Sequence, residues 1–214
     1  METKNVLLVL PVVLAILLIV TYSVITKPAV SESTTEFFVV KGDESCGDCS
    51  STILADDCRS TSGPVLGGVD LVNYFVAYKN SDGTYDESQT GVAGSSDYNY
   101  IYNGYTFYFS SESNLKLFKA NPVKYVPKWG GFCAWGVAGE YCPKYSWSAS
   151  CLGPDGSWSQ WTIQDDRIFF FKDSSPKEKF LTNTTLYIAA GDKRWNDWFG
   201  EDTLKQFNTN CSTA

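Results

Sequence analysis

Cysteine is the residue type in this chain that leaves the most chemistry open. Six of the seven cysteines lie in polar, loop-like stretches: Cys46, Cys49, Cys58, Cys142, Cys151 and Cys211. The seventh, Cys133, lies in an apolar run. In an oxidising compartment most of them should form disulfide bonds, and an odd count leaves at least one unpaired. We expect a local Cys142–Cys151 bridge, at least one further bridge among the other polar cysteines, and a free, partly buried thiol at Cys133.

Two other chemistries compete with disulfide pairing for the cysteines that lie nearest the N-terminus. Cys46-Gly47-Asp48-Cys49 has the C-x-x-C spacing of thiol redox motifs, but its acidic neighbours disfavour a thiolate. A zinc site would need four ligands, and this region supplies three cysteines and no histidine. Thiol–disulfide redox chemistry at Cys46 and Cys49 therefore stays an alternative to structural pairing.

The composition excludes several classes of function. The 214 residues contain no histidine, so Ser-His-Asp triads, Cys-His pairs and histidine metal ligands are absent. The 24 acidic residues outnumber the 17 basic ones and give a net charge of -7, which argues against nucleic acid as a partner. Since no other catalytic constellation is visible either, we expect a protein that is not an enzyme.

Residues 1–27 predict entry into the secretory pathway. Residues 6–26 form an uncharged, mostly apolar run of 21 residues, about the length that crosses a bilayer as a helix. We interpret it as a signal anchor, with a cleaved signal peptide as the alternative. The protein would then be a single-pass membrane protein with a lumenal or extracellular domain, or secreted after cleavage. Asn183 and Asn210 lie in glycosylation sequons, which fits this compartment.

The rest of the chain divides by composition. Residues 28–65 are polar and acidic and contain three cysteines, which indicates a stalk. Residues 66–200 predict one globular domain, with a cysteine-containing loop insertion near 139–160 that is rich in Gly, Pro, Ser and Trp. A tail follows at 201–214. No internal repeat is evident in the sequence.

The strongest local signal is Asn103-Gly104 between two runs of alternating aromatic residues, which predicts a type I′ β-hairpin over 98–109. A two-residue loop fixes the facing pairs, which share one face of the hairpin: Tyr102–Tyr105, Tyr100–Phe107 and Tyr98–Phe109. We expect this aromatic face to be core rather than a ligand platform.

Helices and a second hairpin should pack against this one. Ser111 is typical of a helix N-cap, and Asn121-Pro122 should end that helix. Residues 161–171 predict the second hairpin. Pro176 suits the first turn of another helix, which Gly191 should break before a short final helix. The fold class is therefore α+β: a small antiparallel sheet of aromatic-rich hairpins packed with short helices, preceded by an N-terminal membrane helix and a polar stalk.

The order of these elements resembles the YHS-domain family over about residues 66–199. The segments that carry the likeness are Gly68-Val69-Asp70-Leu71-Val72-Asn73-Tyr74-Phe75, the hairpin from Tyr102 to Ser111, Asn121-Pro122, Lys124-Tyr125-Val126-Pro127, Trp129-Gly130-Gly131-Phe132-Cys133-Ala134-Trp135 and Trp161-Thr162-Ile163. The Tyr-His-Ser signature that names the family is absent from this chain.

This resemblance implies a metal-binding role. YHS domains occur beside heavy-metal transport and sensing modules, and Cys133 matches the cysteine of the family's Gly-Gly-aromatic-Cys-Ala run. A soft transition metal such as copper or zinc would be held by Cys133 with Asp70, close to Tyr74. One thiol and one carboxylate are a small donor set for such a metal.

Three functions remain open from the sequence. The first is an extracytoplasmic YHS-like binding or interaction module without catalytic activity, tethered to a membrane. Its partners would be the membrane, through residues 6–26, and other extracellular or membrane proteins. The second is a metal-binding YHS domain centred on Cys133. The third is a thiol–disulfide redox protein that uses Cys46 and Cys49.

Overall fold

The computed structural model of the chain describes residues 61–139, 149, 152, 156–200, 206–209, 211 and 214. They fall within one compact unit, Phe38–Ala214. Residues 1–60, with the predicted membrane segment and three cysteines, lie outside the described residues, as do Cys142, Cys151 and Asn210. In the part of the chain that is described, no helix combines the length and the hydropathy needed to cross a membrane.

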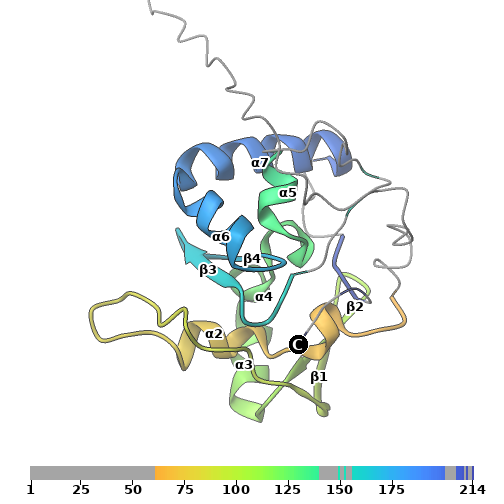
Figure 1. Cartoon of the computed structure of the whole chain (residues 1–214). Coiled ribbons are helices and arrows are strands. Elements are labelled where there is room, and N and C mark those ends of the chain that lie inside the picture. Colours follow the sequence, from red (N-terminus) through yellow and green to blue (C-terminus); the bar gives the residue numbers. More distant parts are fainter. Residues whose placement is uncertain are drawn as a thin grey trace, which may run out of the picture. The chain divides into compact units, whose positions relative to one another are not determined.

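The described elements fall into two successive groups with the same order of elements. The first group is η1 (Val65–Gly68), α2 (Leu71–Val76), β1 (Ser95–Tyr102), β2 (Tyr105–Phe109), α3 (Glu112–Ala120) and α4 (Pro122–Tyr125). The second group is η2 (Lys128–Gly131), α5 (Ala134–Ala138), β3 (Trp161–Gln164), β4 (Arg167–Phe170), α6 (Ser174–Leu181) and α7 (Thr184–Phe199). In Figure 1, α2, α3, β1 and β2 lie in the lower part of the view, and α5, α6, α7, β3 and β4 lie in the upper part.

The fold class is α+β, as the sequence predicts, but the strands form two sheets instead of one. Among the described residues, β1 pairs only with β2, and β3 pairs only with β4, both in antiparallel register. The expectation of a single small sheet is therefore wrong. Each hairpin packs its apolar face against helices, and this packing buries the face without a neighbouring strand.

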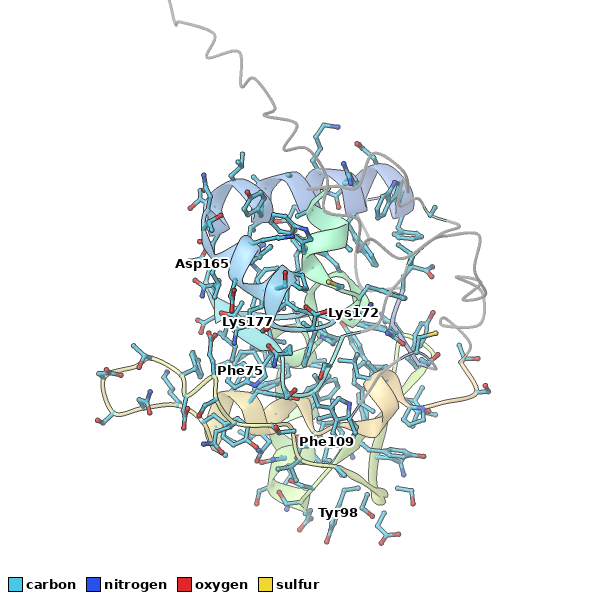
Figure 2. All side chains as sticks on the ribbon, in the orientation of Figure 1. Phe75, Tyr98, Phe109, Asp165, Lys172 and Lys177 are labelled. Carbon is cyan, nitrogen blue, oxygen red and sulfur yellow. The ribbon has the colours of Figure 1, made fainter. Side chains whose placement is uncertain are left out.

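The first hairpin follows the predicted register near its turn and departs from it at the far end. Tyr102 pairs with Tyr105, and Tyr100 pairs with Phe107, as expected. Phe109, however, pairs with Ser95 instead of Tyr98, because the register shifts between Ser95 and Asn99. A bulge of this kind adds residues to one strand and turns its side chains away from the pairing. Tyr98 is consequently exposed at the outer end of the hairpin (Figure 2).

Helix boundaries agree with the capping signals in the first group of elements. The Ser111 side chain accepts a hydrogen bond from the Asn114 backbone N–H at the start of α3, and α3 ends at Ala120, directly before Asn121-Pro122. Phe118 on this helix is fully buried. The predicted second hairpin is present as β3 and β4.

Gly191 does not break the last helix, so the predicted position of the break is wrong: α6 ends at Leu181 and α7 begins at Thr184. α7 runs without interruption from Thr184 to Phe199. A Cβ atom at position 191 would lie 2.3 Å from ring atoms of Trp129. Glycine is therefore required because it lets α7 pass close to the Trp129 indole, and this contact outweighs the low helix propensity of glycine.

The apolar side chains form two clusters, one for each group of elements. The first contains Tyr74, Phe107, Phe109 and Phe118, and the second contains Trp129, Phe132, Phe169, Phe180 and Trp195. Burial of aromatic rings on this scale is the main source of stability for the domain.

The segment 206–209, part of the predicted tail, connects the two groups. The Leu66 backbone N–H donates to the Asn208 carbonyl oxygen at 2.7 Å, and the Asn208 N–H donates to the Gly130 carbonyl oxygen at 2.8 Å. Phe207 is fully buried, and its ring lies 5.2 Å from that of Tyr105. These contacts hold η1 and η2 on either side of the same short segment.

Candidate functional site

Asp70 is a buried carboxylate at the N-terminus of α2, and both of its oxygens are engaged. Oδ1 accepts hydrogen bonds from the backbone N–H groups of Val72 at 3.0 Å and Asn73 at 3.3 Å. Oδ2 accepts from the Ser110 N–H at 2.7 Å, from the Ser110 hydroxyl at 2.6 Å and from the Asn114 amide at 2.7 Å. The carboxylate thus joins α2 to the end of β2 and to α3.

Cys133 is a free thiol, 3% exposed, at the start of α5. Burial raises the pKa of this thiol, while the backbone N–H groups of Lys172, Gly136 and Trp135 oppose the rise. Its side chain makes no cap hydrogen bond to the helix. The net result is a protonated, buried thiol, which is a poor ligand and a poor nucleophile.

Asp70 and Cys133 do not form a metal site with the residues around them. The polar partners of Asp70 belong to α2, Ser110 and Asn114, whereas Cys133 belongs to the second apolar cluster and forms a backbone bridge to Phe170 of the first. No group of three or more Cys, Asp and Glu side chains suited to a metal ion occurs among the described residues. Since copper and zinc require deprotonated, uncommitted donors, these two residues do not fit either metal.

Tyr74 also serves the core. Its hydroxyl donates to the Trp158 carbonyl oxygen at 2.9 Å, and its ring contacts those of Trp161 and Phe170. Burial, together with the nearby Tyr78 and Asp70, raises the pKa of Tyr74 far above its usual range. Cys133 forms a β-bridge with Phe170, so Tyr74 and Cys133 share Phe170 as a neighbour.

The other predicted sites are only partly covered by the described residues. Cys211 takes part in a disulfide bond. Cys46, Cys49, Cys58, Cys142 and Cys151 lie outside the described residues. Asn183 is exposed at the start of α7, where its side-chain oxygen accepts a hydrogen bond from the Leu186 N–H. Glycosylation at Asn183 stays a prediction, and Asn210 lies outside the described residues.

A polar groove lies between the loop that follows α2 and the β3–β4 hairpin. It has a volume of about 540 Å³. The loop contributes Lys79, Gly83, Thr84, Tyr85 and Glu87, and the hairpin contributes Ile163, Gln164, Asp165 and Asp166. Figure 1 shows this loop projecting from the body of the domain, and Figure 2 labels Asp165 at the outer end of the hairpin.

The wall of the groove is held rigid by one hydrogen-bonded group. The Thr162 hydroxyl donates to one carboxylate oxygen of Glu87, and the Lys177 ammonium lies 2.9 Å from the other. The Gln164 amide donates to the Thr162 hydroxyl at 2.9 Å. Glu87 is thus neutralised by Lys177 and ties the loop to β3 and α6.

The other carboxylates of the groove, unlike Glu87, are not paired with a cation. Asp165 and Asp166 form the two-residue turn of the hairpin, are exposed, and have no hydrogen-bonded or ion-paired partner among the described residues. The Lys79 ammonium lies 5.9 Å from the centre of the Tyr85 ring. Burial and the nearby Asp166 raise the pKa of Tyr85. An aromatic ring, a cation above it and two free carboxylates therefore meet at one surface.

No motif in the sequence points to these groove residues. Gln164-Asp165-Asp166 lies within the segment 161–171 that predicts the second hairpin, and the loop around Tyr85 has no motif. The two segments are about 80 positions apart in the chain, and only the packing of β3 against the loop brings them together. The type I′ turn, which favours Asp and Asn at positive φ, was the one local signal for Asp165 and Asp166.

Comparison with known proteins gives one family. Residues 86–129 match the model of the YHS domain, which confirms the resemblance seen in the sequence. The match covers β1, β2, α3 and α4 and ends at Trp129, so Asp70 and Cys133 both lie outside it. Neither the curated proteins nor the solved structures contain a match to this chain.

Proposed function

We propose that this chain, which carries a YHS domain, is a non-enzymatic binding module that holds a cationic side chain of a partner protein in the groove beside Tyr85. The observation that carries the proposal is the unneutralised pair Asp165 and Asp166 at the edge of a groove of about 540 Å³ whose wall includes an aromatic ring.

The negative charge of the groove determines which kind of side chain can bind there. Among the residues that line the groove, Lys79 is the one cation, and Glu87 is already paired with Lys177. The two turn carboxylates leave the surface negative, which attracts ammonium or guanidinium groups and repels phosphate and carboxylate groups. A cation–π contact with Tyr85 adds to the attraction, and Lys79 already occupies such a position.

The shape of the groove favours a macromolecular partner over a buried small molecule. Sites for small molecules are enclosed and mostly apolar, with few polar groups. This groove is bounded by an exposed loop and an exposed turn, and most of its lining residues are polar. A lysine or arginine that projects from a partner's surface could enter it while the partner's other residues contact the loop and the turn.

The proposal also includes a location for the domain outside the cytoplasm, attached to a membrane. The uncharged run at residues 6–26 supports a membrane tether and an extracytoplasmic domain. The metal-binding role centred on Cys133 rests on the family resemblance alone. The redox role of Cys46 and Cys49 rests on their spacing alone.

The proposal can be tested with small probes and the full-length chain. Saturation-transfer NMR would follow N-acetyl-arginine methylamide, N-acetyl-lysine methylamide and N-acetyl-glutamate methylamide. We expect binding of the two cationic probes and none of the anionic one. The double variant D165N/D166N should weaken arginine binding about two- to five-fold for each charge removed, the range expected for exposed ion pairs. D97N, which removes an exposed carboxylate of β1 outside the groove, is the matched control.

Lys79 provides a second variant with the opposite sign. K79M removes the cation that now faces Tyr85 and should strengthen binding of the arginine probe. Equal binding of all three probes, or a D165N/D166N variant that binds arginine like the wild type, would rule out the groove as a cation site.

A further inference from the structure

We infer that the described domain consists of two copies of one structural motif, in which Cys133 has the place that Asp70 has in the first copy. The position to which the family resemblance assigns a metal ligand is then a helix cap. This inference is independent of the groove and its ligand, because neither residue lines that groove.

The two turns that precede the caps have the same unusual backbone. Leu66 has φ 48° and ψ 43°, and Trp129 has φ 49° and ψ 42°. The glycines that follow them, Gly67 and Gly130, have φ 65° and 66°. Leucine and tryptophan rarely adopt the left-handed region, because their Cβ atoms crowd the backbone there. The recurrence of this strained turn directly before a short helix is therefore evidence of a repeated motif.

The elements after the caps keep a constant offset of 62 residues. Ser111 and Asp173 are the N-caps of α3 and α6, and their side chains accept a backbone hydrogen bond. Phe118 and Phe180 are both 0% exposed, and Asn121 and Asn183 are the N-caps of the next helices. Both hairpins turn through two residues at positive φ: Asn103-Gly104 and Asp165-Asp166.

The surroundings of the two caps also correspond. Asp70 accepts from the backbone N–H groups of the second and third residues after it and from that of Ser110, the residue that follows Phe109. The N–H groups that act on the Cys133 sulfur are those of the second and third residues after it, Trp135 and Gly136, and that of Lys172. Ser110 and Lys172 are again 62 residues apart. The same three backbone donors therefore surround both positions.

This repeat is not visible in the sequence, because few equivalent positions of the two copies require the same residue type. The glycine pairs, the buried phenylalanines and the capping asparagines recur, but the helices, the loops and the caps themselves differ. Residue identity alone therefore leaves no internal repeat evident in the sequence. Two copies that share only their backbone geometry and a few core residues have too few identical positions to be detected as a sequence repeat.

The duplication explains why the metal role does not fit Asp70 and Cys133. A cap position directs its side chain at backbone donors, so its acceptor atoms are used within the chain. In the first copy both oxygens of the Asp70 carboxylate accept hydrogen bonds from the surrounding donors. In the second copy the larger, weakly accepting sulfur lies among the same donors without a cap hydrogen bond. A carboxylate at position 133 would find the donors that a cap requires.

The substitution C133D tests this equivalence in the full-length chain. We expect C133D to fold and to have a melting temperature no lower than that of C133A. The reason is that the backbone N–H groups of Trp135, Gly136 and Lys172 can donate hydrogen bonds to the new carboxylate. A138D is the matched control, since it buries the same carboxylate at the C-terminal end of the same helix, at a site that is 2% exposed. A138D should melt well below both variants. Melting of C133D as low as that of A138D would overturn the inference.

The pH dependence of the melting temperature gives a second test. It distinguishes a carboxylate that accepts cap hydrogen bonds from one that the fold merely accommodates. Burial and the nearby charge of Asp173 oppose ionisation at this position, and the three backbone N–H groups favour it. If the donors outweigh the other two, as they do in a cap, the carboxylate has a lowered pKa in the folded state. Its stabilisation is then present above about pH 4 and is lost as the pH falls through the folded value. The melting temperature of C133D should therefore fall more steeply with acid than that of C133A. A C133D curve parallel to that of C133A would contradict the cap.

Metal analysis addresses the ligand directly. The wild type, C133A and D70N, each incubated with one equivalent of zinc or copper(I) and then desalted, should retain equal amounts of metal. Metal that is lost specifically in C133A would make Cys133 a ligand and overturn the assignment as a cap.

Discussion

The two copies of the motif are each fixed by one aspartate, and the two aspartates work in different environments. Asp70, in the first copy, is 0% exposed and accepts hydrogen bonds from five uncharged donor groups. Asp192 on α7, in the second copy, has a side chain 33% exposed and binds two cations, Lys128 at 3.0 Å and Arg167 at 2.8 Å. It also accepts a hydrogen bond from the Trp129 indole at 3.0 Å.

The comparison shows two ways to connect the same set of elements. In the first copy the cap residue itself carries the acceptor, and the interior supplies neutral donors. In the second copy the cap is a thiol, and a carboxylate from the long helix α7 ties η2 to β4 from the surface. Buried networks of neutral donors fail when one partner is removed, whereas half-exposed ion pairs are weakened by solvent and salt.

The largest effect should follow removal of the Asp70 carboxylate. D70A removes the acceptor of five hydrogen bonds and leaves the Asn114 amide only its longer contact, 3.5 Å, to the Ser110 hydroxyl. This change should cost about 3 kcal/mol. Denaturant unfolding of D70A measures the loss, with D97A at an exposed position of β1 as the control. A cost below about 1 kcal/mol would mean that water reaches these donors.

The contact between α7 and η2 in the second copy should give the next largest effect. G191A places a methyl group 2.3 Å from the Trp129 ring and should destabilise the domain by about 1–3 kcal/mol through overpacking. Adding W129F should recover part of this loss, because a smaller ring leaves room for the methyl group. If G191A were as stable as the wild type, the helix would not approach Trp129 closely.

The cap of the second copy should matter less than the cap of the first. C133A removes a small buried group with no cap hydrogen bond, so we expect a loss of about 1 kcal/mol. Unfolding of C133A beside D70A compares the two caps directly. A larger loss for C133A than for D70A would reverse the comparison.

Asp192 should give the smallest effect, one that depends on pH and salt. Burial opposes its ionisation, but Lys128 and Arg167 outweigh burial and lower the pKa of Asp192. Its stabilisation is therefore present above about pH 4 and is lost as the pH falls through the lowered folded value. D192N should cost about 1 kcal/mol at pH 7 and flatten the acid limb of the stability curve.

Salt provides the control for this last prediction. The difference in unfolding free energy between the wild type and D192N should shrink in 1 M NaCl, since screening weakens half-exposed ion pairs. The difference between the wild type and D70A should persist, because its hydrogen bonds are buried. Equal responses of the two variants to salt would contradict the distinction between the copies.

Much of the local structure could be predicted from the sequence. Asn103-Gly104 predicted a hairpin and its first two pairs, because a two-residue turn fixes the register beside it. Ser111 and Asn121-Pro122 predicted the ends of α3, because capping and proline geometry act within one turn. Part of the resemblance to the YHS domain, the hairpin at 102–111 and the residues 121–127, rested on the segment that the family match covers.

Features that depend on contacts between distant segments could not be predicted in this way. Gly191 breaks a helix by propensity, but the Trp129 ring 62 positions earlier makes it necessary inside one. The pairing of Tyr98 depended on a bulge that the aromatic alternation does not reveal. The groove depended on a loop and a turn that meet only in the folded chain.

The sequence by itself determined the α+β class, the two hairpins and the absence of histidine chemistry, because these follow from composition, turn residues and short-range geometry. Only the tertiary structure decided that Asp70 is a saturated cap and that Cys133 is its counterpart. The physical reason is that a side chain's role depends on the donors around it. The donors at Ser110 and Lys172 lie about 40 residues beyond the caps, where the hairpins return to them.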